Sequence, residues 1–323
     1  MTGITIDHRE QEGVSTALAD EIRDGLTREL KELSPKHLYD ERGSRLFDRI
    51  TTLPEYYPTR CERAILNRRA PEIVEWSGAR DLVELGSGSA SKTRALLYAM
   101  AGAGTLRRYV PFDVDPSVIE ASALELTEIY PGLEVHGVVG DFAHDLHRIP
   151  AGDHRLFVFL GGTIGNLYPN ERADFLGRLR GLMADGDRLL VGTDLVKGTE
   201  TLEAAYNDSA GVTAEFNRNV LSVLNDSVGA DFDPDAFEHV AFFDADNSWI
   251  EMRLRSTRDQ RVRVSGCDLA VDFAAGEEMR TEISTKFTRE GIERELATAG
   301  LELDAFHTDD EGLFGLSVAA LPG

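Results

Sequence analysis

The chain has very little cysteine, with only Cys61 and Cys267 among its 323 residues. Two cysteines exclude the disulfide framework of a small secreted domain and a cysteine-rich zinc site. The sequence also lacks an apolar run of the roughly 20 residues that cross a bilayer. Its first residues, MTGITIDHREQEG, carry charges where a signal peptide has an apolar core. We therefore expect a cytoplasmic protein without a membrane partner.

Positive charge is also scarce, because 34 Lys and Arg stand against 57 Asp and Glu, a net charge of −23. Such a surface repels phosphate backbones, so no nucleic-acid partner is expected. Charged residues at 28% and hydrophobic residues at 42% are typical of a folded chain. The length allows two domains, and we expect a monomer that binds a small molecule.

From residue 81 onward, apolar runs alternate with helical patterns, which predicts a parallel sheet with right-handed crossovers. The last two apolar runs are joined by a connection so short that they must pair antiparallel. The predicted strands are Asp81–Leu85, Tyr109–Phe112, Leu133–Val139, Leu156–Leu160, Arg188–Gly192, Leu301–His307 and Leu313–Ala320. The predicted helices begin at Ser91, at Asp115-Pro116, at Pro169 (to Met183) and at Thr288 (to Ala299).

Residues 192–288 are too many for a crossover loop. They contain a helical stretch, Glu200–Leu224, and an alternating strand, Trp249–Ser256, and a further helical pattern covers Ser15–Leu33. The predicted fold class is therefore α/β, a doubly wound, mostly parallel sheet with a C-terminal antiparallel hairpin, plus a second α+β domain. We expect the first domain at 60–194 plus 286–323 and the second at 10–59 plus 195–285.

The stretch DLVELGSGSASKT places the glycine turn 86–88 where the first strand meets a helix. Glycine there lets the backbone approach a ligand closely, although a tight turn alone would also explain it. A dinucleotide site prefers a third glycine, and position 91 is Ser. The turn thus disfavours a dehydrogenase but suits S-adenosylmethionine, which has no pyrophosphate.

Two acids follow the next two strands. Asp113 is placed to accept from both ribose hydroxyls, and Asp141 from the adenine amino group, with Phe142 packing on the base. Each acid alone would more simply be a solvated strand end or a helix cap. Lys92, expected in the first helical turn, is either a partner of the methionine carboxylate or a surface lysine. Ligands bind at the carboxyl ends of parallel strands, where the glycine turn, Asp113 and Asp141 all lie. The terminal hairpin marks the class I methyltransferase variant of the fold. Together these features predict a site for S-adenosylmethionine.

The fourth strand leads into FLGGTIGNLYP, which would face the transferred methyl group. An Asn/Asp-Pro-Pro-aromatic turn, usual in methylases of base amino groups, is absent there. Asn166 in this stretch is suited to orient an amine, and it would also suit a cap of the following helix.

Several stretches in order resemble the histidine-specific Nα-methyltransferases of ergothioneine biosynthesis. The resemblance covers about residue 35 to the C-terminus and is carried by LYDERGSRLFDRITTLPEYYPTR, VELGSGSASKTR, PFDVDPS, FLGGTIGNL, TDLVK, AYNDSAGVTAEFNRNVL and DFAAGEEMRTEISTKF. It implies transfer of three methyl groups from S-adenosylmethionine to the α-amine of L-histidine, giving hercynine and S-adenosylhomocysteine. It implies that the cofactor is held by Gly86, Lys92, Asp113, Asp141 and Phe142. It implies that histidine is held by Tyr56, Asn166, Tyr206, Glu282 and Ser284, with Tyr39 and Thr213 close by.

The residues themselves fit a small zwitterion. Glu282 and Ser284 share one face of a strand and can bind two imidazole nitrogens, although an edge strand in solvent would explain them too. Met252 points inward, as core packing or as the wall of a side-chain pocket. Tyr56 and Tyr206 can donate hydrogen bonds to a carboxylate, or simply pack.

Methyl transfer to an amine mainly requires alignment and an unprotonated nitrogen. We expect the sulfonium charge and a desolvated pocket to lower the amine pKa, and Tyr39 or a water to relay the proton, so that Asn166 and Tyr39 are the candidate catalytic residues. No metal is expected: His144, Asp145 and His147 lack closed ligand spacing. The alternatives are a methyltransferase for another amino acid, a noncatalytic S-adenosylmethionine-binding module, and a dehydrogenase.

Overall fold

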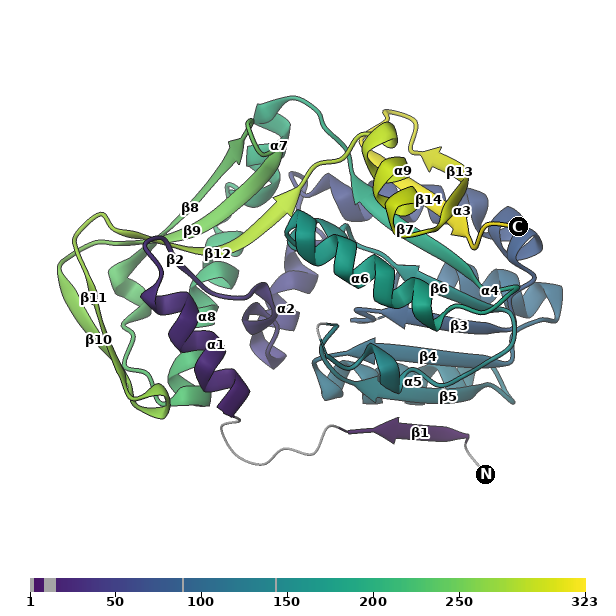
Figure 1. Cartoon of the computed structure of the whole chain (residues 1–323), viewed down its shortest axis with the longest axis horizontal. Helices are drawn as coiled ribbons and strands as arrows, with labels where there is room; N and C mark the ends of the chain where they lie inside the picture. Colours follow the sequence, from purple (N-terminus) through teal and green to yellow (C-terminus); the bar gives the residue numbers. More distant parts are fainter. Residues whose placement is uncertain (1–2, 9–15, 89, 143) are drawn as a thin grey trace. The chain divides into compact units, whose positions relative to one another are not determined.

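The computed structural model describes residues 3–8, 16–88, 90–142 and 144–323. Ser15 as a helix start and residue 10 as a domain start lie outside the described residues. The chain divides into two compact units (Figure 1). Unit 1 comprises Met1–Arg9, Pro58–Val196 and Thr285–Gly323, and unit 2 comprises Glu10–Tyr57 and Lys197–Ser284. Within the described ranges, no helix combines the length and the apolar character needed to span a membrane.

An eight-stranded sheet forms the centre of unit 1, in the order β1-β5-β4-β3-β6-β7-β14-β13 (Figure 1). The first six strands run parallel, and β14 is antiparallel to both β7 and β13. The predicted fold class, a mostly parallel sheet with an antiparallel terminal hairpin, is therefore confirmed. The strands are β1 (Ile4–Asp7), β3 (Asp81–Leu85), β4 (Arg108–Asp113), β5 (Glu134–Val139), β6 (Arg155–Phe159), β7 (Arg188–Asp194), β13 (Glu302–Thr308) and β14 (Phe314–Ala320).

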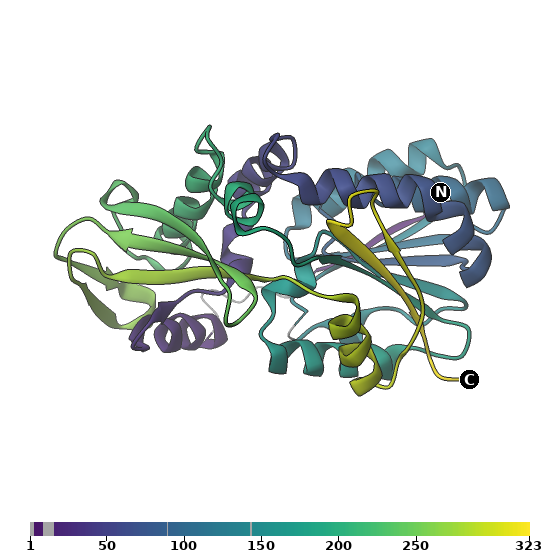
Figure 2. The same cartoon turned by 90° about the horizontal axis from the view of Figure 1, so that it is seen from above.

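Helices cover both faces of this sheet (Figure 2). One face packs against α3 (Tyr57–Ser77), α4 (Arg94–Ala103) and α5 (Pro116–Ile129), and the other against α6 (Pro169–Leu182) and α9 (Arg289–Thr298). Because side chains alternate along a strand, Leu82 joins the first core and Val83 and Leu85 join the second. Two short 3-10 turns, η2 (Leu146–Arg148) and η3 (Thr163–Asn166), follow β5 and β6.

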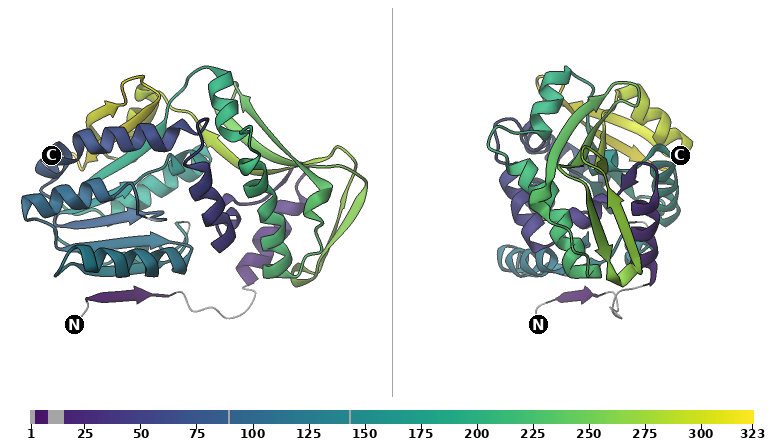
Figure 3. Two further views of the ribbon diagram at one scale, coloured as in Figure 1. Left: turned by 180° about the vertical axis from the view of Figure 1, so that it is seen from behind. Right: turned by 90° about the vertical axis from the view of Figure 1, so that its left-hand side faces the viewer.

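Unit 2 is built on a four-stranded sheet of order β2-β12-β9-β8, with β10 and β11 as a separate antiparallel pair. Helix α8 packs on β8 and β9, and α2 packs on α8 (Figure 3). The helices are α1 (Thr16–Thr27), α2 (Glu41–Ile50), α7 (Thr199–Tyr206) and α8 (Val212–Val228), with 3-10 turns η1 (Pro35–Leu38), η4 (Pro234–Ala236) and η5 (Ser265–Cys267). The strands are β2 (Lys31–Glu32), β8 (Phe237–Asp244), β9 (Trp249–Ser256), β10 (Gln260–Val264), β11 (Leu269–Phe273) and β12 (Glu278–Thr285).

Local signals placed some helix starts correctly and others not. Asp115 caps α5 as predicted, accepting from the Ser117 N–H at 2.9 Å. The predicted cap at Ser91 is wrong, because α4 begins at Arg94 with Thr93 as its N-cap. Lys92 therefore lies in the turn before the helix and not in its first helical turn.

Two helical predictions were too long. The pattern Ser15–Leu33 forms α1 only as far as Thr27, because residues 31–32 pair with β12. The pattern Glu200–Leu224 is two helices, because the Asp208 carboxylate accepts from the N–H groups of Val212 and Thr213 and so starts α8 anew.

Candidate active site

The glycine turn after β3 is tied to the end of β4. The Gly86 N–H donates to the Phe112 carbonyl at 2.8 Å, and the Gly88 N–H donates to Oδ2 of Asp113 at 2.9 Å. Both glycines have a positive φ, +70° and +45°, which a side chain disfavours. A Cβ on Gly86 would lie 3.4 Å from the Phe142 ring. The turn thus brings together three of the predicted cofactor residues, Gly86, Asp113 and Phe142.

The Asp113 carboxylate is held by backbone groups on both oxygens. Besides the Gly88 contact, Oδ1 accepts from the Asp115 N–H at 3.0 Å. Burial raises the pKa of Asp113, and the nearby Asp115 adds to the increase. Because a carboxylate oxygen can accept more than one hydrogen bond, these contacts leave acceptor capacity for a diol. Asp113 is therefore a buried acid at the end of β4 whose carboxylate is held in place by backbone N–H groups. It is not the cap of α5, because that cap is Asp115.

Asp141 and Phe142 lie in a loop with its own hydrogen bonds. The Asp141 carbonyl accepts from the N–H groups of His144 at 3.0 Å and Asp145 at 2.8 Å, and its own N–H donates to Asp145 at 2.9 Å. The Phe142 ring stacks on Phe112, with centroids 5.5 Å apart and planes 20° apart. The loop thus places an acid and an aromatic ring at the same sheet edge as Asp113, an arrangement that suits a purine.

Lys92 has an internal partner that the sequence did not reveal. Its Nζ lies 2.8 Å from Oε2 of Glu62, and the exposed fractions of the two side chains are 19% and 0%. Lys92 is therefore not a solvated surface lysine. With three N–H donors, its ammonium can contact Glu62 and still bind a second carboxylate.

The turn after β6 carries Asn166. Gly161 and Gly162 both have a positive φ, and Asn166 is the last residue of η3, partly buried. The alternative role of Asn166 as a helix cap is wrong, because Tyr168 is the N-cap of α6. A Cβ on Gly165 would lie 2.9 Å from the Thr285 carbonyl, so the backbone beside Asn166 is tightly packed.

In unit 2, two predicted substrate residues are in direct contact. The hydroxyls of Tyr206 and Ser284 lie 2.7 Å apart, and both side chains are buried. The Tyr206 carbonyl lies 2.9 Å from Nε2 of His239, while Nδ1 of His239 lies 2.9 Å from the amide nitrogen of Asn217. The ring therefore donates through Nε2 and accepts at Nδ1, so it is neutral, and burial lowers the pKa of His239.

Glu282 precedes Ser284 by two residues in β12 and is also buried, with 8% of its surface exposed. Met252 in β9 is buried, as expected from its alternation with Glu251. Glu251 is not solvent-exposed, however: it accepts from Trp249, Arg253 and Arg280 on the other face of the strand. That ion-pair network therefore lies on the face of β9 opposite Met252.

Two of the remaining predicted residues of unit 2, Tyr39 and Tyr56, belong to one aromatic group. Tyr39 and Tyr56 both pack edge-on against Phe47, with centroids 5.6 and 6.1 Å away, and Tyr56 also contacts Tyr206 at 6.3 Å. Thr213 is buried in the first turn of α8, its N–H donating to Asp208 at 2.7 Å. Unit 2 thus brings Tyr39, Tyr56, Tyr206 and Ser284 into one chain of contacts.

Glu84, like Glu62, is a buried acid that the sequence patterns did not predict. It is fully buried in β3, and the hydroxyls of Thr93 and Tyr109 both donate to its carboxylate. Burial raises the pKa of Glu84 to about 7, against the opposing effect of these hydrogen bonds. A titratable group near neutral pH therefore lies two residues before the glycine turn.

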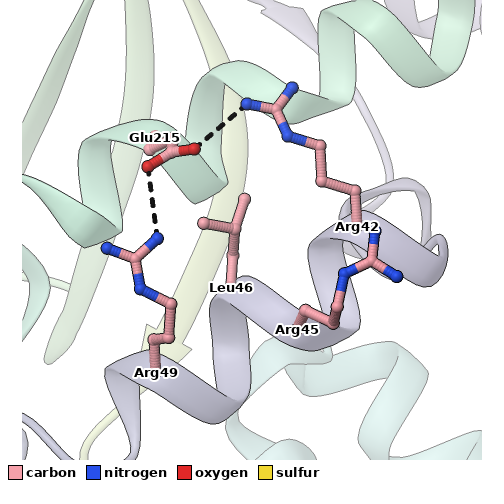
Figure 4. A pocket seen from close by; sticks show the side chains of 5 residues that line it. All are labelled: Arg42, Arg45, Leu46, Arg49 and Glu215. Carbon is pink, nitrogen blue, oxygen red and sulfur yellow. Dashed lines mark hydrogen bonds and ion pairs between the residues drawn. The ribbon is translucent and has the colours of Figure 1, made fainter.

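A surface pocket of about 340 Å³ in unit 2 contains none of the predicted site residues. It is lined by Arg42, Arg45, Leu46, Arg49 and Glu215 (Figure 4). Glu215 contacts Arg42 at 3.1 Å and Arg49 at 3.5 Å. Three of the residues that line the pocket thus form exposed ion pairs with one another.

The segment that includes His144, Asp145 and His147 has local partners. Asp145 accepts from the Asp141 N–H, and Nδ1 of His147 lies 3.0 Å from the His144 carbonyl. Across the residues that the structure describes, no three His, Cys, Asp or Glu side chains are grouped as metal ligands would be.

The sheet order, the antiparallel terminal hairpin, the glycine turn after β3 and the acids after β4 and β5 define a class I S-adenosylmethionine-dependent methyltransferase fold. Comparison with known proteins makes this more specific. The chain belongs to the family of histidine-specific, S-adenosylmethionine-dependent methyltransferases, whose model matches residues 18–321.

Relatives of this chain support the same family. The chain is 53% identical over 319 residues to the histidine N-alpha-methyltransferase of Mycolicibacterium smegmatis, covering 99% of each chain. It is 53% identical to that of Mycobacterium tuberculosis, covering 97% of this chain and 98% of the relative. It is 30% identical to ergothioneine biosynthesis protein 1 of Neurospora crassa, covering 84% of this chain and 31% of that protein.

Proposed function

We propose that this chain transfers three methyl groups from S-adenosylmethionine to the α-amine of L-histidine. The product is hercynine, and the reaction is the first step of ergothioneine biosynthesis. The observation that carries the proposal is the 53% identity, over nearly the whole of both chains, to a histidine N-alpha-methyltransferase. A cytoplasmic location and a monomeric state remain predictions.

In this proposal, unit 1 binds the methyl donor. Asp113 accepts from the ribose hydroxyls, Asp141 accepts from the adenine amino group, and Phe142 packs on the base. Gly86 lets the backbone approach, and Lys92 binds the methionine carboxylate. The backbone contacts of Asp113 support its part, since the N–H groups of Gly88 and Asp115 fix the orientation of both carboxylate oxygens.

Unit 2 supplies the groups that recognise the amino acid. Glu282 and Ser284 bind the two imidazole nitrogens, and Met252 limits the size of the side-chain pocket. Tyr56 and Tyr206 donate to the carboxylate, with Thr213 beside them. The contact between Tyr206 and Ser284 supports this assignment, because it links a residue assigned to the carboxylate with one assigned to the imidazole.

The chemistry requires the amine lone pair to point at the methyl group. S-adenosylmethionine supplies an electrophilic methyl and a good leaving group. Asn166 accepts from an amine N–H through its side-chain carbonyl, which orients the nitrogen without using the lone pair. A free α-amine is mostly protonated at neutral pH, so a proton must leave before each transfer. Tyr39, or a water beside it, passes that proton outward.

Mass spectrometry of a reaction with purified chain, S-adenosylmethionine and L-histidine tests the proposal. We expect products that carry one, two and three added methyl groups, with the trimethylated form accumulating. A panel of amino acids with other side chains, run in parallel, tests specificity. Preference for another amino acid would contradict the assignment to histidine, and binding of S-adenosylmethionine without any transfer would indicate a noncatalytic module.

A further inference from the structure

Glu62 of α3 occupies a position that its neighbours would predict to be apolar. Ile65, Leu66 and Ile73 lie on the same face of the helix and are buried in the core of unit 1. The Glu62 side chain is fully buried as well. Because burying an uncompensated carboxylate in such a place is strongly unfavourable, the contacts of Glu62 must compensate for its lost hydration.

Those contacts come from two turns at the carboxyl edge of the sheet. Oε2 lies 2.8 Å from Nζ of Lys92, in the turn before α4. The N–H of Gly161, in the turn after β6, donates to Oε1 at 2.8 Å and to Oε2 at 3.0 Å. One carboxylate therefore joins α3 to two of the turns that carry predicted site residues.

Glycine at two positions leaves room for this pair. A Cβ on Gly192 of β7 would lie 2.1 Å from Oε1 of Glu62, and a Cβ on Gly161 would lie 2.8 Å from Nζ of Lys92. A side chain at position 192 would therefore displace the carboxylate, and one at position 161 would displace the ammonium. The absence of a side chain at positions 161 and 192 therefore leaves space for the ion pair of Glu62 and Lys92.

We propose that Glu62 is a positioning residue that holds the Lys92 ammonium beside Gly161, ready to bind the methionine carboxylate of S-adenosylmethionine. The inference rests on the proposed function, which assigns Lys92 to the cofactor. Glu62 itself touches no ligand. It acts by restricting a long, flexible side chain before binding, so that less conformational entropy is lost when the cofactor arrives.

Isothermal titration of the full chain with S-adenosylhomocysteine measures this effect. Glu62→Gln keeps the volume and one acceptor for the Gly161 N–H, but removes the charge that faces Lys92. We expect its Kd to rise about tenfold, the scale of a charged hydrogen bond. The KM for histidine should change less than twofold, since Glu62 acts on the cofactor side.

A double-mutant cycle with Lys92→Met distinguishes positioning from a general structural role. If Glu62 acts through Lys92, then Glu62→Gln has no further effect on Kd in the Lys92→Met background. An equal rise in both backgrounds, or no rise in the original one, would overturn the inference. If Lys92→Met itself binds S-adenosylhomocysteine normally, both the assignment of Lys92 and this inference fail. Methylation of histidine by the unaltered chain is tested separately.

The matched control is Asp187→Asn. Asp187 is an equally buried acid of unit 1, and its carboxylate contacts Arg155 at 2.6 Å at the opposite, amino edge of the sheet. This variant should lower Tm without changing Kd. Should Glu62→Gln fail to fold, Glu62→Asp keeps the charge but withdraws it from Lys92. It should weaken binding only where Lys92 is present, and normal binding by Glu62→Asp would contradict the inference.

Discussion

The hydroxyl of Tyr206, the last residue of α7, lies 2.7 Å from the hydroxyl of Ser284 in β12. The two residues are 78 positions apart in the chain and both are buried. One hydroxyl donates to the other, and each hydroxyl group has one donor and two acceptor lone pairs. This arrangement fits the recognition of a polar zwitterion.

Tyr206→Phe should therefore raise the KM for histidine about tenfold, the scale of one buried hydrogen bond. The Kd for S-adenosylhomocysteine should stay within about twofold. Steady-state kinetics with each substrate varied checks this. Tyr57→Phe is the control, because that hydroxyl accepts from Lys197 at 2.7 Å and has no predicted ligand role. Equal effects of the two variants would contradict the assignment of Tyr206.

Asn166→Ala should lower kcat by about 100-fold while changing cofactor affinity little, since loss of alignment acts on the transition state. Single-turnover kinetics with bound S-adenosylmethionine measures the chemical step directly. Asn225→Ala removes a partly buried asparagine that contacts the backbone of Phe232, and should lower Tm only. An unchanged kcat in Asn166→Ala would rule out the orienting role.

Asp113→Ala should weaken S-adenosylhomocysteine binding by about 10- to 100-fold, because the ribose contact and the ordered glycine turn are lost together. Calorimetric titration gives the Kd. The neighbouring variant Asp115→Asn perturbs the cap of α5 and should lower Tm while leaving Kd close to normal. A normal Kd in Asp113→Ala would place the ribose elsewhere.

Glu84 predicts a specific pH dependence of stability. Burial raises its pKa from 4.5 to about 7, so the folded chain holds the proton more tightly than the unfolded chain. Its contribution to stability is therefore fully present below pH 4.5 and is lost as the pH rises through 7. The loss amounts to about 3 kcal/mol at full ionisation.

Glu84→Gln should remove that part of the pH dependence. Urea unfolding at several values between pH 5 and 8 is the measurement, and the slope of unfolding free energy against pH should become less negative than in the unaltered chain. Glu125→Gln, which removes an exposed partner of Arg94, is the control and should leave the slope unchanged. Identical slopes for Glu84→Gln and the unaltered chain would show that Glu84 does not titrate in this range.

Part of the fold followed directly from local patterns. Strand β3 and helix α5 begin at the predicted residues, and the hairpin of β13 and β14 pairs antiparallel as expected. Strand β1 was not predicted, because four residues next to a charged stretch carry little signal, and their pairing partners are residues 135–138. The break between α7 and α8 was missed as well, since helical spacing continues through it.

The sequence alone determined the alternation of strands and helices between residues 81 and 194, the glycine turn and the acids at strand ends, because apolar periodicity, caps and turn residues act between near neighbours in the chain. Only the tertiary structure decided that Lys92 pairs with Glu62, that Glu84 lies between Thr93 and Tyr109, and that Tyr206 reaches Ser284. The partners come from separate helices, strands and turns, and a buried polar group is satisfied by whichever side chain the packed fold brings within reach. No local pattern carries that information.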